Sequence, residues 1–526
     1  MKKVISLICL MIVLPVFLAA ADEEAPDEET QKLHFIHIDN GMFMDDQMDT
    51  IYYKTTREDV ANMVKNIDKN TVVVHFHGGL VDEKSAFERP MKKGGIYEAY
   101  SKDAYPIFFA WRSGFMSTID QMYDKESDIG QIIDAVKKVI SARTKKQKRL
   151  ISGDDEIINN FIASVNFRRF WFLWHVWKET LLDRYYKAYN KLTPAEQGEL
   201  KEAIDNKVTY TTNDLKNCLG GTTGTLCLDK IISVVSHRLF QRTIEGRHHN
   251  LTATLQEESW NSIEILSNFI NDGWGKMKCI TFNAFQDDHT KYGGTAFLKE
   301  LNDLIGQKPD TKVILVGHST GAEYICNLLE DAARADKYPL LNKEGEEFTF
   351  DVIFEAPACT FERFNKTLTT AVDKIENFRM FALHDCREKK DSLAGDKYSK
   401  LFYSNSLLYF VASVPEPTRY NSSLPNGCET INNPPYEYLD KPILGMERYF
   451  FNKPFDYELK YPEVKSVKSF LGYDNPVVEI KTVFSKSKGA DGWKITAKKH
   501  GQCDDNKKLL ESLQHIIKFG FETNEK

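Results

Sequence analysis

A serine at the end of an apolar segment is the residue of this chain best placed for nucleophilic chemistry. Residues 313–316 are β-branched or aliphatic and lead into Gly317-His-Ser-Thr-Gly321, and a segment with helical periodicity, 322–333, follows at once. A serine at a sharp strand-to-helix turn needs strained backbone angles, and side chains in place of the flanking glycines would collide with a neighbouring strand or helix. The pattern predicts that Ser319 is a nucleophile, whereas a phosphate-binding turn would need a lysine and further glycines.

A serine hydroxyl is a weak nucleophile at neutral pH, so Ser319 needs a histidine as base and a carboxylate that orients the histidine. After such a turn, the acid is expected to follow a later strand. The predicted strand 378–383 runs into His384-Asp385, which places Asp385 at the carboxyl edge of the sheet. We therefore predict Asp385 as the acid, with Glu388 and Asp391 as alternatives.

The base is expected after the last strand of the sheet. Residues 493–497 form a predicted strand, His500 follows it, and a predicted terminal helix occupies 506–521. His515 lies inside that helix, where a packing role is expected, and most other histidines precede the serine. His500 is the predicted base.

The oxyanion formed by an attacking serine must be met by preset donors, usually backbone N–H groups. One would belong to Thr320, and the other to Gly79 or Leu80, in a loop after the early strand 71–76. His75 and His77 share a face of that strand and, with Asp82 nearby, could in principle bind a metal, but the further Asp-His pair of a metallohydrolase is missing. We predict neither a metal nor another cofactor.

Continuous apolar runs separated by helical stretches predict a mostly parallel sheet with helices on both faces. An amphipathic helix after 58 begins with a predicted capping box, Thr55 and Glu58. The predicted strands are residues 33–38, 71–76, 105–111, 278–282, 312–316, 348–355, 378–383 and 492–497.

Two intervals interrupt this α/β pattern. The interval 127–277 is predicted to be a helical cap insertion, in which aromatic residues recur at helical spacing, and 401–477 an irregular excursion rich in Tyr, Pro and Asn. The remaining segments are assigned to the α/β core: 32–126, 278–400 and 478–526.

The first residues have the three parts of a secretory signal peptide: two lysines, an apolar run, and Ala19-Ala-Ala21. We predict a signal over 1–21, an acidic disordered leader over 22–31, and a protein that is periplasmic or secreted. An uncleaved anchor is the alternative. No later stretch is apolar enough to span a bilayer, so no transmembrane anchor is expected after cleavage.

The net charge bears on the class of binding partner, and the cysteines bear on which residues form disulfides. The formal net charge of -7 and the absence of a basic stripe argue against a nucleic-acid partner. In an exported protein some cysteines oxidise, and Cys218 and Cys227, which flank a glycine-rich loop, are the predicted disulfide. Cys326 and Cys359 are expected to be buried thiols.

The nucleophile motif, His77-Gly-Gly79, Asp385 after a strand and His500 before the last helix together resemble the α/β-hydrolase superfamily. Within it, Phe109-Ala-Trp-Arg-Ser113 and His500-Gly-x-x-Asp504 look like a loosely characterised group of bacterial hydrolase-like proteins. The resemblance implies an α/β-hydrolase fold and acyl transfer through a Ser-His-acid triad without a cofactor.

The expected substrate is a small-molecule or lipid-like acyl ester, because an aromatic helical cap could supply an apolar acyl site. A peptidase or amidase with the same triad remains an alternative. So does a non-catalytic binding protein, because a fold does not determine a function.

Overall fold

The computed structural model describes residues 25–113, 264–341, 347–391, 405–416, 440–451 and 457–522, with a few single residues between them. The predicted signal peptide, most of the predicted cap, and Cys218 and Cys227 lie outside the described residues. No helix within the described ranges is long and apolar enough to cross a membrane.

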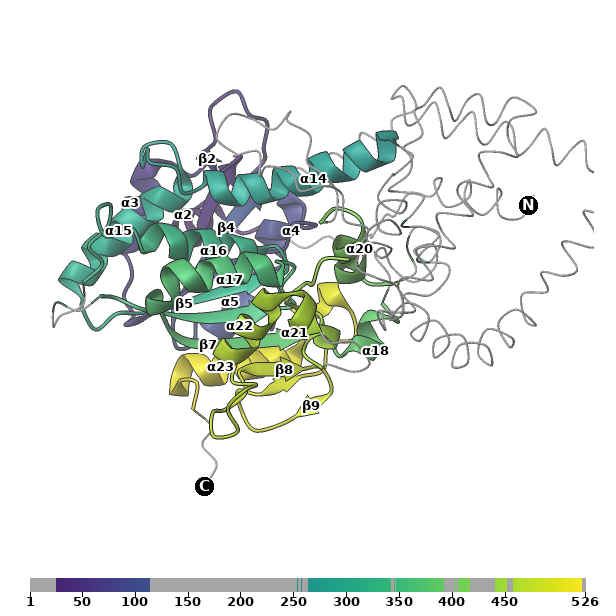
Figure 1. The fold of residues 1–526 in the computed structure, drawn as a ribbon. Coiled ribbons are helices and arrows are strands. Elements are labelled where there is room, and N and C mark those ends of the chain that lie inside the picture. The colour runs from purple at the N-terminus through teal and green to yellow at the C-terminus, as the bar shows by residue number, and fades with distance from the viewer. Residues whose placement is uncertain are drawn as a thin grey trace, which may run out of the picture.

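An eight-stranded sheet forms the centre of the molecule, in the order β2-β1-β4-β3-β5-β6-β7-β8 (Figure 1). The edge strand β2 is antiparallel to β1, and every other neighbouring pair is parallel. The strands are β1 Phe35–Asp39, β2 Met42–Phe43, β3 Thr71–Phe76, β4 Tyr105–Arg112, β5 Lys312–His318, β6 Phe350–Glu355, β7 Ile375–Ala382 and β8 Thr482–Phe484.

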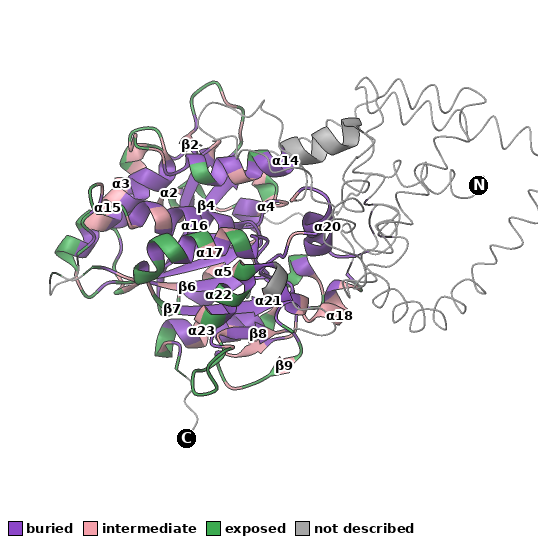
Figure 2. Cartoon of the chain, in the orientation of Figure 1, coloured by how far each residue is buried: buried purple, intermediate pink, exposed green. Residues whose placement is uncertain are grey.

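Helices cover both faces of this sheet, and successive side chains of each central strand enter opposite cores. Val313 and Leu315 belong to one buried cluster, and Ile314 and Val316 belong to the other. The strands are buried while the outer helices are exposed on their outward faces (Figure 2). Because helices bury both faces of the sheet, its strands need continuous apolar runs, and the sequence has this pattern.

The first cluster packs under the helices α3 Arg57–Lys65, α14 Glu264–Asn283, α15 Gly293–Gln307, α16 Gly321–Ala332, α17 Phe361–Ala371 and α22 Pro462–Phe470. The second lies under α4 Glu83–Glu88, α5 Ile96–Tyr100 and α23 Lys507–Phe519. Shorter helices complete the described chain: α2 Glu28–His34, α18 Asp385–Glu388, α20 Leu407–Ser413 and α21 Tyr457–Lys460.

Two predicted strands of the main sheet are wrong. Residues 278–282 lie in helix α14, where Trp274, Met277 and Ile280 recur at helical spacing and are buried in the first cluster. A short apolar run fits a strand or a buried helix equally well, so tertiary packing decides between them. Lys494–Ile495 forms β10, which pairs only with β9, Ser487–Lys488, so the eighth strand of the sheet is β8.

Two helix starts also differ from the prediction. The capping box of α3 uses Thr56 and Asp59, one position later than predicted, because the hydroxyl of Thr55 bonds the backbone of β1 instead. The predicted disordered leader ends in α2, which Asp27 caps and whose first-turn acidic residues favour the positive end of the helix. Within the predicted excursion, α20, α21 and α22 are regular helices.

Candidate active site

The predicted turn between strand and helix is present at Ser319, which lies between β5 and α16 with φ of 55°. A Cβ on Gly317 would lie 2.8 Å from the carbonyl oxygen of Gly321, and a Cβ on Gly321 would lie 2.1 Å from the carbonyl oxygen of Phe76 in β3. The predicted steric need for both glycines is confirmed. The Ser319 N–H donates to the carbonyl of Glu355 at 2.9 Å, which pins the turn to β6.

His500 lies directly against the serine. Its Nε2 is 2.9 Å from Ser319 Oγ, and the two residues are only 5% and 2% exposed. Burial, with a smaller contribution from His318, lowers the pKa of His500 to about 3. The ring is therefore neutral at pH 7, the form that can accept the serine proton.

The carboxylate nearest to His500 in the hydrogen-bond network is Asp391, whose Oδ2 accepts the His500 main-chain N–H at 2.7 Å. His500 Nδ1 is buried and has no hydrogen-bond partner among the described residues. Asp391 is itself buried, and it lies at the end of the turn that follows α18. The structure thus brings Ser319, His500 and Asp391 into one cluster.

Asp385, the acid predicted from the sequence, makes its contacts elsewhere. It accepts hydrogen bonds from the hydroxyl of Tyr409 at 2.6 Å and from Lys389 at 2.5 Å, and no contact with His500 is found in the described part of the chain. Burial raises the pKa of Asp385, but Lys389 and Arg448 outweigh burial and lower it below its ordinary value. These contacts tie α18 to α20, so Asp385 acts as an anchor in this arrangement.

Glu388, the other alternative, is completely buried at the end of α18. Burial raises its pKa well above the ordinary value, which disfavours the ionised form. An uncharged carboxyl group stabilises an imidazolium poorly. Among the three candidate acids, the contact with His500 favours Asp391.

The predicted oxyanion donors lie together beside the serine. A Cβ on Gly78 would be 3.1 Å from Ser319 Cβ, and one on Gly79 would be 2.9 Å from Thr320 Oγ1, so the glycine loop lies against the turn. The backbone N–H groups of Gly79, Leu80 and Thr320 donate to no acceptor in the described part of the chain. Unpaired N–H groups beside a nucleophile can receive an oxyanion.

His77 holds this glycine loop in place. Its Nδ1 donates to the carbonyl of Gly78 at 2.9 Å, and its Nε2 accepts the N–H of Trp111 at 3.2 Å. Both ring nitrogens are thereby occupied and the ring is neutral, which disfavours the alternative that His75 and His77 bind a metal. Burial lowers the pKa of both histidines to about 4.

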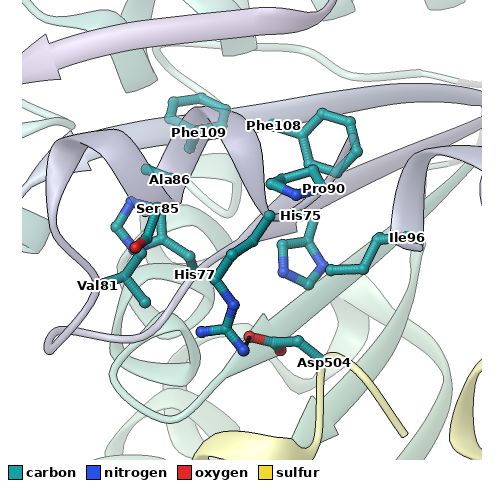
Figure 3. A pocket seen from close by; sticks show the side chains of 11 residues that line it. His75, His77, Val81, Ser85, Ala86, Pro90, Ile96, Phe108, Phe109 and Asp504 are labelled. Carbon is teal, nitrogen blue, oxygen red and sulfur yellow. Dashed lines mark ion pairs between the residues drawn. The ribbon is translucent and has the colours of Figure 1, made fainter. Parts of the chain in front are cut away.

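Sequence reasoning missed a buried polar cluster behind the serine. His318, Glu355 and Asp504 are all nearly inaccessible, and His318 Nδ1 lies 3.1 Å from Asp504 Oδ2. Next to them is a cavity of about 20 Å³, which fits one water molecule, lined in part by His75, His77 and Asp504 (Figure 3). The one signal in the sequence is that Asp504 follows His500 by a single helical turn.

The cysteines differ from the prediction in one respect. Cys279 in α14 is disulfide-bonded. Cys326 and Cys359 are free and buried, as predicted, and Cys386 and Cys503 are also free.

Comparison with known families agrees with this architecture. Residues 269–395 match the model of a family described as "Alpha/beta hydrolase of unknown function (DUF900)". The chain has the α/β-hydrolase fold. The predicted fold class is confirmed. The matched segment includes Ser319, Asp385 and Asp391 but neither the glycine loop nor His500. Comparisons with curated proteins and with solved structures gave no match.

We predict that Gly321→Ala destabilises the protein by about 1–3 kcal/mol or more, because the new Cβ would overlap the backbone of β3. The matched control is Gly306→Ala in α15, where the new Cβ meets nothing within 4 Å and the helix gains up to about 1 kcal/mol. Urea denaturation followed by circular dichroism measures both. Equal stability of the two variants would contradict the proposed crowding.

We predict that folding stability falls as the pH drops from about 6.5 to about 4. In this window the unfolded chain protonates His75, His77 and His500, whereas the folded protein keeps them neutral because it buries them. Each contributes a loss of about 2 kcal/mol at pH 5. Urea denaturation at pH 7 and pH 5 tests this.

In the same measurement, His77→Gln should reduce the difference in unfolding free energy between pH 7 and pH 5 by about 2 kcal/mol. A wild-type protein equally stable at both pH values would refute the prediction.

Proposed function

We propose that this protein is a serine hydrolase that cleaves an acyl ester, with Ser319 as nucleophile, His500 as base and Asp391 as acid. The observation that carries the proposal is the 2.9 Å contact between Ser319 Oγ and His500 Nε2 at a strained turn. A buried neutral imidazole beside a serine hydroxyl is the arrangement that general-base activation requires.

In the proposed reaction, His500 Nε2 takes the proton of Ser319 Oγ as the oxygen attacks the carbonyl carbon of the ester. The negative charge on the carbonyl oxygen is met by the N–H of Thr320 and of Gly79 or Leu80. The tetrahedral intermediate collapses as Nε2 returns the proton to the leaving alcohol. A water molecule then attacks the acyl-enzyme by the same steps and releases the carboxylic acid.

Asp391 is proposed to stabilise the imidazolium that forms during each proton transfer. Its bond to the His500 main chain already holds the carboxylate beside this residue. His500 Nδ1 lacks a partner among the described residues, and Asp391 is the carboxylate proposed to meet it. An ionised carboxylate there would also fix the tautomer that leaves Nε2 free to accept a proton.

An apolar acyl group is the proposed preference. Helix α14 packs over the glycine loop, and a Cβ on Gly79 would lie 2.4 Å from the sulfur of Met277. Met277, Trp274 and the partly buried Leu80 belong to or pack against one apolar cluster, so an apolar wall reaches the oxyanion donors. Apolar walls with a few polar groups are typical of sites for small organic ligands.

Export is also part of the proposal. Its supports are the N-terminal signal pattern and the disulfide at Cys279, since disulfides persist mainly in oxidising compartments.

We predict that a fluorophosphonate probe labels the purified protein at Ser319, because the probe needs an activated serine. Ser319→Ala should abolish the adduct, and His500→Gln should slow its formation by about 10³-fold or more. Peptide mass spectrometry locates the adduct. A folded wild-type protein that stays unlabelled would support the alternative of a non-catalytic binding protein.

We predict that Asp391→Asn lowers the labelling rate by about 10³–10⁴-fold, the cost of losing the acid of such a triad. Asp385→Asn should keep the wild-type rate but lower the thermal midpoint, because it loses charge pairing with Lys389. Glu388→Gln is the neutral isostere at the third position and should label normally. If Asp385→Asn is the slow variant instead, the acid is Asp385.

A further inference from the structure

His318 connects the serine turn to the loop that carries the base. It is the last residue of β5 and immediately precedes Ser319. Its Nε2 lies 3.2 Å from the main-chain carbonyl oxygen of His500, and the two imidazole rings are 5.3 Å apart between centroids. One side chain thus spans the two segments whose separation sets the distance between nucleophile and base.

The chemistry of these contacts fixes one proton of the ring. A carbonyl oxygen only accepts hydrogen bonds, so Nε2 of His318 must carry a hydrogen. Nδ1 then faces the carboxylate of Asp504, with Nδ1 and Oδ2 at the ion-pair distance of 3.1 Å. The ring thus lies between the two groups: its Nε2 donates to the His500 carbonyl, and its Nδ1 lies close to Asp504 without a hydrogen bond of good geometry.

Asp504 is held firmly in turn. Arg89, at the end of α4, lies 4.0 Å from its Oδ2, and the same guanidinium donates to the carbonyl of Gly501 and to Asp505. Burial and the charge of Asp504 raise the pKa of Glu355, which lies beside this carboxylate, well above its ordinary value. Burial raises the pKa of Asp504, but His318 and Arg89 outweigh burial and keep this pKa far below its usual range.

We infer that His318 and Asp504 form a positioning pair that holds the His500 main chain at the distance from Ser319 that proton transfer requires. His500 is then fixed at three points: its N–H to Asp391, its carbonyl to His318, and its Nε2 to Ser319. This inference rests on the proposed function, and it gives a role to the residue of the motif between Gly317 and Ser319.

The positioning role predicts a specific pattern among conservative variants of His318. Glutamine places its amide nitrogen where histidine has Nε2, so His318→Gln keeps a donor for the His500 carbonyl. Asparagine is one methylene shorter, so its amide reaches only the region of Nδ1. His318→Asn therefore keeps a polar group beside Asp504 but loses the hydrogen bond to the His500 carbonyl. The two variants share the same amide chemistry and differ in reach.

The experiment measures the maximal rate and the half-saturating concentration of fluorophosphonate inactivation for each variant. His318→Asn should lower the maximal rate by about 100-fold, the cost of a misplacement near 1 Å, with little change in half-saturation. His318→Gln should stay close to the wild type. The maximal rate of Asp504→Asn should fall between those of the two His318 variants. The control is Asp505→Asn, which removes a neighbouring carboxylate that also binds Arg89 and should keep the wild-type rate.

Thermal unfolding of each variant separates positioning from folding, because a variant that merely unfolds loses its thermal transition as well as its rate. If folded His318→Asn and His318→Gln inactivate equally fast, the positioning role is refuted while Ser319 labelling still upholds the hydrolase. If the wild type is not labelled, the proposed function fails. Histidine ¹⁵N NMR then decides separately: a proton on His318 Nε2 whose ring shifts change in Asp504→Asn supports the pair, and unchanged shifts overturn it.

Discussion

The contact between Ser319 Oγ and His500 Nε2 joins residues 181 positions apart in the chain. It depends on the elements of the fold that place both side chains at one edge of the sheet. β5 delivers the serine at the carboxyl edge of the sheet, and the segment after β10 delivers the histidine to the same edge. The strained φ of Ser319 persists because both flanking glycines are locked between β3 and α16. Such strain survives only where the surroundings over-determine the backbone.

Desolvation is the second constraint on this site. His75, His77 and His500 are nearly inaccessible, and burial keeps these three rings neutral. A neutral base and neutral loop-holding histidines suit proton transfer, but they cost stability in acid. On another side of the cluster Arg89 and His318 lie against Asp504, and burial raises the pKa of Glu355 beside them. The site therefore combines buried neutral histidines with a carboxylate, Asp504, whose ionised form Arg89 favours.

Local patterns sufficed for some residues and failed for others. Ser319 is predictable because the glycine spacing around it is a local steric requirement. His500 is predictable because it lies between the last predicted strand and the terminal helix. The acid was ambiguous, since Asp385, Glu388 and Asp391 all follow β7 closely and only their contacts distinguish them. Residues 278–282 were misassigned because a short apolar run carries no reliable period.

The sequence by itself determined the parallel α/β sheet, the strand-turn-helix at Ser319 and the glycine loop opposite it, because each depends on residue types and spacings within a short stretch. The tertiary structure decided that Asp391 lies at the His500 backbone, that Asp385 anchors α20, and that His318 bridges to Asp504. Those outcomes depend on how distant loops meet, and the direction of a loop side chain follows from packing that no local spacing encodes.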